Sequence, residues 1–252
     1  RKINDGVEQA VQMELTEMVG YIHALQNHFS DFSAAVDWSK PRSESEVKTV
    51  VGSTVASIHL AHAKSGKDFE QLYGQTNENE WWKTITDVLG DQETRKIFLE
   101  NMWRSPVLVS PLRGVPLQYL LRFHFGDRQI RGVDLGAGLH VALPLLNSAK
   151  YLEAKLPEKD KMKRYTDPIN ISLGLGIDKQ KREEALVWAK ACYWPLKENL
   201  GAAGRLSDLY YEVLPKGHQF PFLVTDLLNQ EDSLQRVHKA VNQDGRFDFV
   251  FS

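Results

Sequence analysis

The 252-residue chain contains a single cysteine, Cys192, which excludes an intrachain disulfide bond. It has no apolar run near the roughly 18 residues of a membrane-spanning helix, and no basic-then-apolar signal opens it. We therefore expect a reducing, cytoplasmic setting and no membrane partner.

The sequence also lacks an excess of charge of either sign. It has 31 lysines and arginines against 33 acidic residues, a formal net charge of −2. These charges are interspersed and form no basic stripe that would follow a phosphate backbone, so a nucleic-acid partner is not indicated. The oligomeric state stays open, a homo-oligomer included.

Amphipathic helices are predicted throughout residues 1–126. Over residues 5–26, apolar side chains recur at spacings of three and four, as the buried face of a helix requires. Further helices are expected at 47–61, 67–73, 78–89, 91–102 and 114–125. We therefore predict an all-helical N-terminal cap region that closes over a substrate.

After Gly126 the pattern alternates between strands and helices, which is typical of a parallel sheet. Strands are predicted at 129–134, 171–177, 221–226 and 246–251, with helices around 139–155, 180–200 and 231–242. Because Pro144 lacks a backbone donor, the first of these helices should kink there or begin near Leu143. The prediction for residues 127–252 is a Rossmann-like α/β domain with a mostly parallel sheet.

A glycine turn follows the first predicted strand in RQIRGVDLGAGLHVALPLLN, residues 128–147. Gly136, Ala137 and Gly138 would let a ligand approach the backbone, and the next helix would offer its positive N-terminus. Asp134 would repel the pyrophosphate of a dinucleotide, and Val141 stands where the dinucleotide motif has its third glycine. S-adenosylmethionine has no phosphate and carries an ammonium group that Asp134 would attract. The acid therefore favours S-adenosylmethionine over NAD.

Two more acids follow the ends of predicted strands, where open α/β sheets bind ligands. We expect Asp178 to accept hydrogen bonds from both ribose hydroxyls, and Asp226, next to Leu227, to lie within reach of the adenine amino group. Asp134 and Asp178 are further apart than the ~20 residues of a plain β-α-β unit. The charged segment 157–168 is interpreted as an insertion that explains the excess.

The order GVDLGAGLHVALPLLN, GLGIDKQKREEALVWAKACYWPLKENL, LVTDLL and RFDFVFS resembles a bacterial family of unknown function with a class I S-adenosylmethionine-dependent methyltransferase core. The resemblance covers roughly residues 100–252 and includes the Trp-rich pattern W-x-x-A-C-x-W-P that begins at Trp188. It implies a methyltransferase fold behind a helical N-terminal region.

Each candidate residue also has a purely structural interpretation. The glycine turn after Asp134 is also compatible with a tight turn that binds nothing, although its position favours binding. Asp178 and Asp226 are typical helix N-cap residues, and His140 either faces the cofactor or occupies the first helical turn. Trp188, Tyr193 and Trp194 are interpreted as core residues, and Cys192 as a small buried apolar residue.

No metal site or catalytic residue is predicted. His59 and His62 lie three apart on an expected helix, but no acidic or cysteine partner follows at a matching interval. A general base is needed if the methyl acceptor is a hydroxyl or an amine, and the sequence does not identify one.

The functional hypothesis is an S-adenosylmethionine-dependent methyltransferase whose acceptor, a small molecule or a protein, is unidentified. One alternative is a binding module that holds the cofactor without catalysis. A dinucleotide-dependent oxidoreductase is disfavoured by Asp134 and Val141.

The last predicted strand, residues 246–251, is rich in phenylalanine, and we expect it to be buried on both faces. Because related sheets continue past a fourth strand, we expect the domain to be incomplete at its C-terminus. The free edge is then predicted to be covered by missing residues, a second chain or the helical region.

Overall fold

The computed structural model describes residues 16–36, 44–66, 75–104, 107, 114–147, 168–192 and 219–251. The chain forms two compact units. Unit 1 comprises Arg1–Leu108 and Val187–Arg205, and unit 2 comprises Val109–Leu186 and Leu206–Ser252. This division differs from a single boundary after residue 126, because the chain passes from one unit to the other three times.

The described part of unit 1 is helical, as predicted. Its helices are α2 (Thr16–Asn27), α3 (Phe29–Ala35), α4 (Glu44–Lys64), α5 (Glu78–Gly90), α6 (Gln92–Asn101) and the end of α11 (Arg182–Cys192). Asp91 caps α6 by accepting a hydrogen bond from the Thr94 amide at 2.9 Å. The short helix α3 was not predicted, and the helix expected at 67–73 lies outside the described residues.

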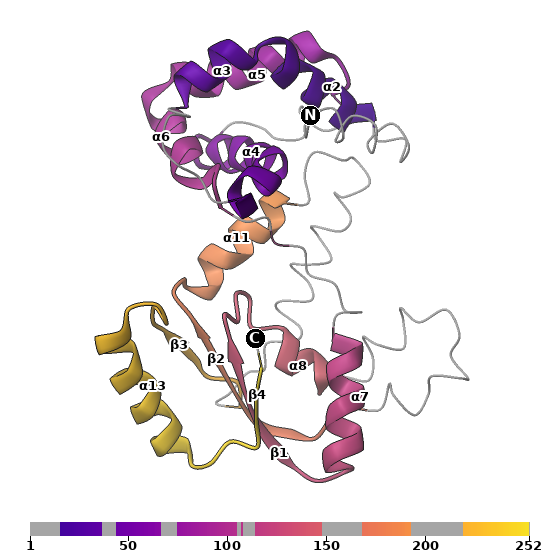
Figure 1. The fold of residues 1–252 in the computed structure, drawn as a ribbon, viewed down its shortest axis with the longest axis vertical. Helices are drawn as coiled ribbons and strands as arrows, with labels where there is room; N and C mark the ends of the chain where they lie inside the picture. Colours follow the sequence, from indigo (N-terminus) through magenta and orange to yellow (C-terminus); the bar gives the residue numbers. More distant parts are fainter. Residues whose placement is uncertain are drawn as a thin grey trace, which may run out of the picture. The chain divides into compact units, whose positions relative to one another are not determined.

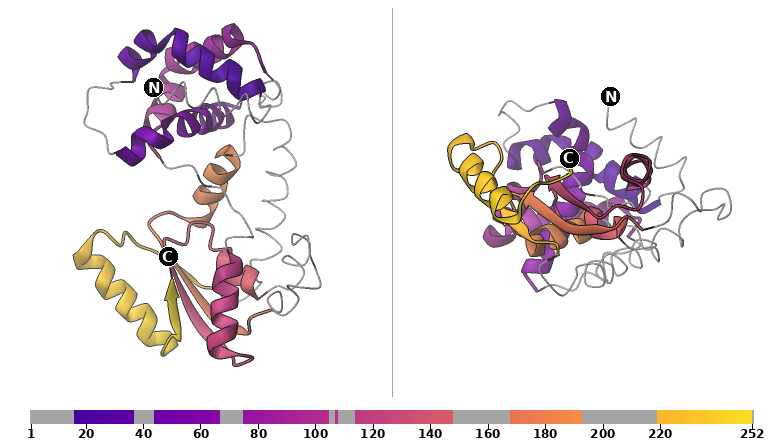
Figure 2. Two further views of the ribbon diagram at one scale, coloured as in Figure 1. Left: turned by 45° about the vertical axis from the view of Figure 1, so that its right-hand side comes forward. Right: turned by 90° about the horizontal axis from the view of Figure 1, so that it is seen from below.

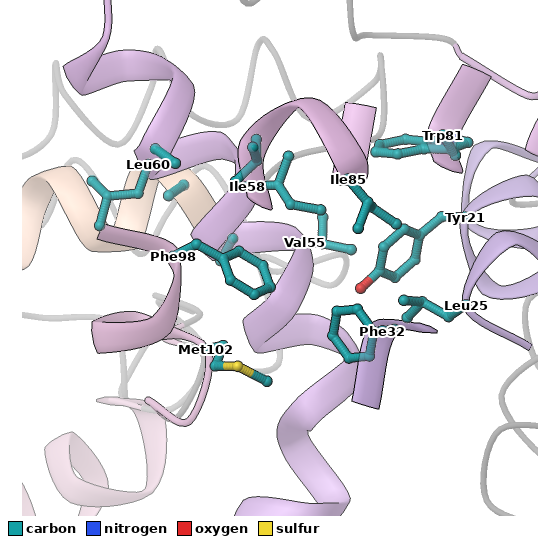
Figure 3. Packing of buried hydrophobic residues seen from close by; sticks show 14 of the residues in the cluster. Tyr21, Leu25, Phe32, Val55, Ile58, Leu60, Trp81, Ile85, Phe98 and Met102 are labelled. Atoms are coloured by element: carbon teal, nitrogen blue, oxygen red, sulfur yellow. The ribbon is translucent and has the colours of Figure 1, made fainter. Parts of the chain in front are cut away.

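Aromatic side chains from several helices form the core of unit 1 (Figure 3). Tyr21 of α2 meets Trp81 of α5 edge to face, with ring centroids 5.3 Å apart. Phe32 of α3 meets Phe98 of α6 in the same manner at 6.2 Å. Edge-to-face pairs add ~0.5–1.5 kcal/mol each beyond the burial of their area.

Trp188 of α11 belongs to this core rather than to a ligand-stacking surface, which confirms its interpretation as a core residue. Its side chain is 0 % exposed, and the Arg104 guanidinium lies 4.6 Å from its ring centroid. Cys192 is partly buried nearby, and burial raises the pKa of its thiol to about 11. Tyr193 and Trp194 lie outside the described residues.

Unit 2 contains a four-stranded parallel sheet, which confirms the predicted α/β class (Figure 1). Its strands are β1 (Ile130–Leu135), β2 (Ile171–Asp178), β3 (Phe222–Val224) and β4 (Phe249–Phe251), in the order β3-β2-β1-β4. The two outer strands are shorter than predicted.

Helices pack against both faces of this sheet. Helices α7 (Gly114–Phe125) and α8 (Ala142–Leu146) lie on one face, and α13 (Gln230–Asp244) lies on the other (Figures 1 and 2). Leu121, Ile130, Leu143 and Ile171 form the core under α7 and α8. On the α13 side, the core is formed by Val133, Leu175 and Ile177, with Val237 of α13 packed against them.

Helix α8 is much shorter than the helix expected at 139–155. It begins at Ala142, close to the alternative start near Leu143, and ends at Leu146. Pro144 lies in its first turn, where a missing backbone donor costs little. Residues 148–167, with most of the expected insertion, lie outside the described residues.

The expectation that the last strand is buried on both faces is wrong for Val250, which is 60 % exposed. Val250 lies level with the buried Val133 of β1, but the core under α13 is centred on β1 and β2. Among the described strands, β4 pairs only with β1. The predicted cover along its other edge stays a prediction.

Candidate functional site

The candidate site lies where the carboxyl ends of the parallel strands meet in unit 2. The amides of Gly136 and Ala137 donate to the Ile177 carbonyl oxygen at 2.9 and 3.0 Å, which holds the turn after β1 against the end of β2. The Thr225 amide donates to the Asp178 carbonyl oxygen at 2.8 Å and brings the end of β3 to the same place. The chain that follows β1 therefore lies beside the ends of its neighbours.

This place is also a topological switch point. The order β3-β2-β1-β4 runs in one direction from β1 to β3, whereas β4 lies on the other side of β1. In open α/β sheets, ligands bind in the crevice outside the carboxyl ends of the strands at such a reversal.

The glycine turn is built from left-handed backbone conformations. Gly136 has a φ of 70° and Gly138 a φ of 52°, a region that side chains rarely allow. The Gly138 amide donates to Oδ2 of Asp178 at 2.9 Å. Three successive amides, at positions 136 to 138, thus donate to β2, and this leaves none of the three for a phosphate.

Asp178 anchors this turn. Its Oδ1 accepts a second hydrogen bond, from the Gln180 amide at 3.0 Å. Helix α11 begins only at Arg182, so Asp178 is not its N-cap. Each carboxylate oxygen retains a lone pair for a ligand hydroxyl.

Asp226 and Leu227 follow β3 and are exposed. Oδ1 of Asp226 accepts from the Leu228 amide at 3.0 Å, while Asn229 is the N-cap residue of α13. The helix-cap alternative for Asp226 is therefore not realised. Leu227 is 38 % exposed and adds an apolar surface at this strand end.

Asp134 lies in β1 and is 5 % exposed, and the imidazole of His140, in the loop that follows, is its ionisable neighbour. Its Oδ2 lies 3.7 Å from Nδ1 of His140, longer than a hydrogen bond but within ion-pair distance. Burial raises the pKa of Asp134, the contact with His140 lowers it, and the charge of Asp178 raises it. The charged form of this carboxylate is therefore costly until a cation accompanies it.

His140 is fully buried despite its place in a turn. Its φ is 53°, a left-handed value that histidine adopts more readily than most residues. Nε2 lies 2.9 Å from the Gly174 carbonyl oxygen. Nδ1 makes no hydrogen bond to any of the described residues.

Gly176 makes room for this imidazole. A Cβ atom at Gly176 would lie 2.4 Å from the His140 ring, so no other residue fits this register of β2 without a shift. Gly176 is paired with Asp134 of β1 on one side and with Phe222 of β3 on the other. The ring centroids of Phe220 and Phe222 lie 6.2 and 5.8 Å from the imidazole and complete an apolar surrounding.

Sequence reasoning left the orientation of His140 open and did not pair it with Asp134. A signal was present in the glycines of β2, at positions 174 and 176. Isolated glycines within a strand indicate that another group approaches the backbone closely. The partner itself had no sequence signal.

The other candidates lie in unit 1. Burial lowers the pKa of His59 to about 4, and its Nδ1 lies 3.3 Å from the Ala191 carbonyl oxygen. In the part of the chain that the structure describes, no three His, Cys, Asp or Glu side chains are grouped as metal ligands. A surface hollow on α6, lined by residues that include Arg95 and Lys96, contains none of the predicted site residues. None of the described helices is both long and apolar enough to cross a membrane.

Comparisons with family models, with curated proteins and with solved structures found no match to this chain. The features of this chain that bear on function are therefore the parallel sheet and the residues at its carboxyl edge.

Proposed function

We propose that unit 2 is a Rossmann-like domain that binds S-adenosylmethionine, and that the protein transfers the cofactor's methyl group to an acceptor. The observation that carries this proposal is the position of Asp134 and its glycine turn. Both lie at the carboxyl end of β1, beside the reversal of strand order, and the turn is hydrogen-bonded to Asp178. The order β3-β2-β1-β4 is also that of the first four strands of the doubly wound fold.

Charge and hydrogen bonding favour this cofactor over a dinucleotide. A pyrophosphate would meet Asp134 and Asp178, while the turn amides that would cradle it donate instead to Ile177 and Asp178. S-adenosylmethionine presents an ammonium and a sulfonium group, which suit an acidic site.

We assign the two ends of the cofactor to different strand ends. Asp134 attracts the ammonium group, directly or through water. Asp178 accepts from the ribose hydroxyls, while Asp226 and Leu227 lie beside the adenine. In this arrangement the cofactor extends across the carboxyl edge from β1 towards β3.

Methyl transfer from a sulfonium is an in-line displacement. The acceptor's lone pair forms a bond to the methyl carbon as the carbon–sulfur bond breaks, and the sulfur leaves as a neutral thioether. The protein contributes positioning and exclusion of water. A hydroxyl or amine acceptor also loses a proton to a base, which is unassigned.

Calorimetry with S-adenosylmethionine, S-adenosylhomocysteine and NAD tests the binding step. The first two ligands are expected to bind and NAD is not. Replacing Asp134 by Asn should weaken S-adenosylmethionine binding by ~1–3 kcal/mol, because a charge-assisted contact is lost. The matched control is Glu184→Gln, which removes an exposed carboxylate of α11 and should bind like the unaltered protein. Equal affinity in a folded Asp134→Asn variant would remove the assigned role.

Transfer of labelled methyl from the cofactor to a cell extract or to small-molecule pools tests catalysis. Cofactor binding without any labelled product would favour the non-catalytic binding module. NAD binding with no response to S-adenosylmethionine would overturn both.

A further inference from the structure

The contact between Asp134 and His140 fixes part of the protonation state of this site. The atom facing Nε2 of His140 is the Gly174 carbonyl oxygen at 2.9 Å, and a carbonyl oxygen only accepts hydrogen bonds. Nε2 must therefore carry a proton. A neutral His140 then presents the lone pair of Nδ1 towards Asp134.

Two lone pairs facing each other in a buried site are unfavourable. Nδ1 has no hydrogen bond within the described residues, and Oδ2 of Asp134 lies 3.7 Å away. One additional proton resolves this conflict. Placed on either atom, it removes the repulsion between the two lone pairs and leaves the pair electrically neutral, which burial favours.

We propose that Asp134 and His140 share one proton in the free protein, and that the cationic amino group of the ligand replaces this proton on binding. The proton passes to water, the pair becomes singly negative, and the ligand's positive charge restores neutrality. This inference rests on the proposed function, because it takes the methionine end of S-adenosylmethionine as the ligand group that reaches Asp134.

The charged groups around the pair are compatible with this exchange. Asp178, from β2, adds negative charge to the field at Asp134 and favours retention of a positive charge there. Arg182, from α11, has its guanidinium 4.7 Å from the Phe222 ring centroid, and the His140 ring centroid lies 5.8 Å from the same centroid. Gly176 and the aromatic rings that pack on the imidazole contribute no titratable group.

Proton exchange makes ligand selection depend on pH and on the ligand's charge. While the pair is protonated, affinity for S-adenosylhomocysteine should rise about tenfold for each pH unit, since one proton leaves for each ligand bound. Adenosine has no ammonium group, so its affinity should not follow pH in this way.

The exchange is measured by calorimetry of S-adenosylhomocysteine binding in buffers of different ionisation enthalpy, over a series of pH values. At pH values where the pair is protonated, the unaltered protein and Glu184→Gln should release about one proton for each ligand bound. Asp134→Asn, which has no titratable group at this position, should bind more weakly and release none. Asp134→Ala serves the same purpose if the Asn variant does not fold.

The ¹⁵N spectrum of the His140 imidazole supplies a readout at the atom itself. In the free protein, the ¹⁵N chemical shift of Nδ1 should differ from that of an imidazole nitrogen with an unshared lone pair. Binding of S-adenosylhomocysteine should change this chemical shift, whereas binding of adenosine should not. His140→Asn identifies the signal by its disappearance, because asparagine tolerates the same left-handed φ.

The failures of the two proposals have different signatures. Binding of S-adenosylhomocysteine without proton release, or with an unmoved Nδ1 signal, would overturn the exchange and leave the cofactor assignment standing. The absence of any binding would overturn the cofactor assignment and the exchange with it.

Discussion

Asp134 combines burial with an acidic side chain, so its effect on stability depends on pH. Its folded-state pKa lies above the ordinary value of an aspartate, with burial as the largest cause. The folded protein therefore binds more protons at this residue than the unfolded chain does. Stability from Asp134 is fully present below the ordinary pKa and falls as pH rises towards the raised one.

The difference in unfolding free energy between the unaltered protein and Asp134→Asn should thus decline as pH increases above about 4. Urea unfolding followed by far-UV circular dichroism at a series of pH values measures it. Tryptophan emission reports on the unfolding of unit 1 alone, because all six tryptophans of the sequence belong to unit 1, whereas Asp134 belongs to unit 2. If the free energies of unfolding of the two proteins changed in parallel with pH, the folded protein would not favour the protonated form of Asp134.

Asp178 has a structural role in the glycine turn and a proposed role in ligand binding, and the two can be separated. Replacement by Ala removes the acceptors for the Gly138 and Gln180 amides and should cost ~1–3 kcal/mol of stability. It should also weaken adenosine and S-adenosylhomocysteine alike, since both carry the ribose. Calorimetry with both ligands checks this, and a loss of stability with unchanged affinities would assign Asp178 to the turn alone.

At the scale of the element, one face of β2 carries two glycines, and aromatic rings from neighbouring segments pack against the strand backbone there. Gly174 faces the Phe220 ring and Gly176 faces the His140 ring. A strand with two glycines loses side-chain packing of its own, and here the rings of the neighbouring segments occupy that space. The register of β2 therefore determines whether the His140 imidazole fits.

Gly176→Ala should destabilise unit 2 by ~1–3 kcal/mol, because the new methyl group overlaps the imidazole and forces it or the strand to move. It should also reduce the proton release that accompanies S-adenosylhomocysteine binding. Gly90→Ala is the control, as a Cβ at this α5 position meets nothing within 4 Å. Equal stabilities in far-UV circular dichroism melts of the two variants would contradict the close fit at Gly176.

Local patterns predicted the strands and the turn, but not what packs against them. The apolar run before Asp134 and the glycines after it located β1 and the site at its end. The place of His140 depends on a left-handed φ at a non-glycine residue and on a ring that folds back over the next strand. Neither is encoded in local periodicity. The short α8 and the exposure of Val250 likewise depend on tertiary packing.

At the scale of the whole molecule, each of the two units is built from two separate segments of the chain. The periodicity around Trp188 indicated a buried helix face, but it did not identify the core that buries it. The structure places Trp188 with residues of α2, α4, α5 and α6, although its helix, α11, is the next described element after β2 in the sequence. A boundary after residue 126 would remove it from that core.

Trp188→Ala should therefore destabilise unit 1 by ~3–5 kcal/mol, the usual cost of removing a buried tryptophan. Val187→Ala, at the exposed neighbouring position of α11, should cost less than ~0.5 kcal/mol. Urea unfolding monitored by tryptophan emission compares the two variants. Similar midpoints would contradict the assignment of Trp188 to the core of unit 1.

Because each unit is built from two segments, the units are completed in a fixed order during synthesis of the chain. The first segment of unit 1 ends at Leu108, and its second segment begins only at Val187. At ~5–20 residues per second, a ribosome needs roughly 4–16 s to make the intervening residues. Throughout that interval the core that contains Tyr21 and Trp81 lacks Trp188, which belongs to the same cluster. The helical unit is therefore still incomplete on the ribosome when β1 and β2 of the other unit have already been made.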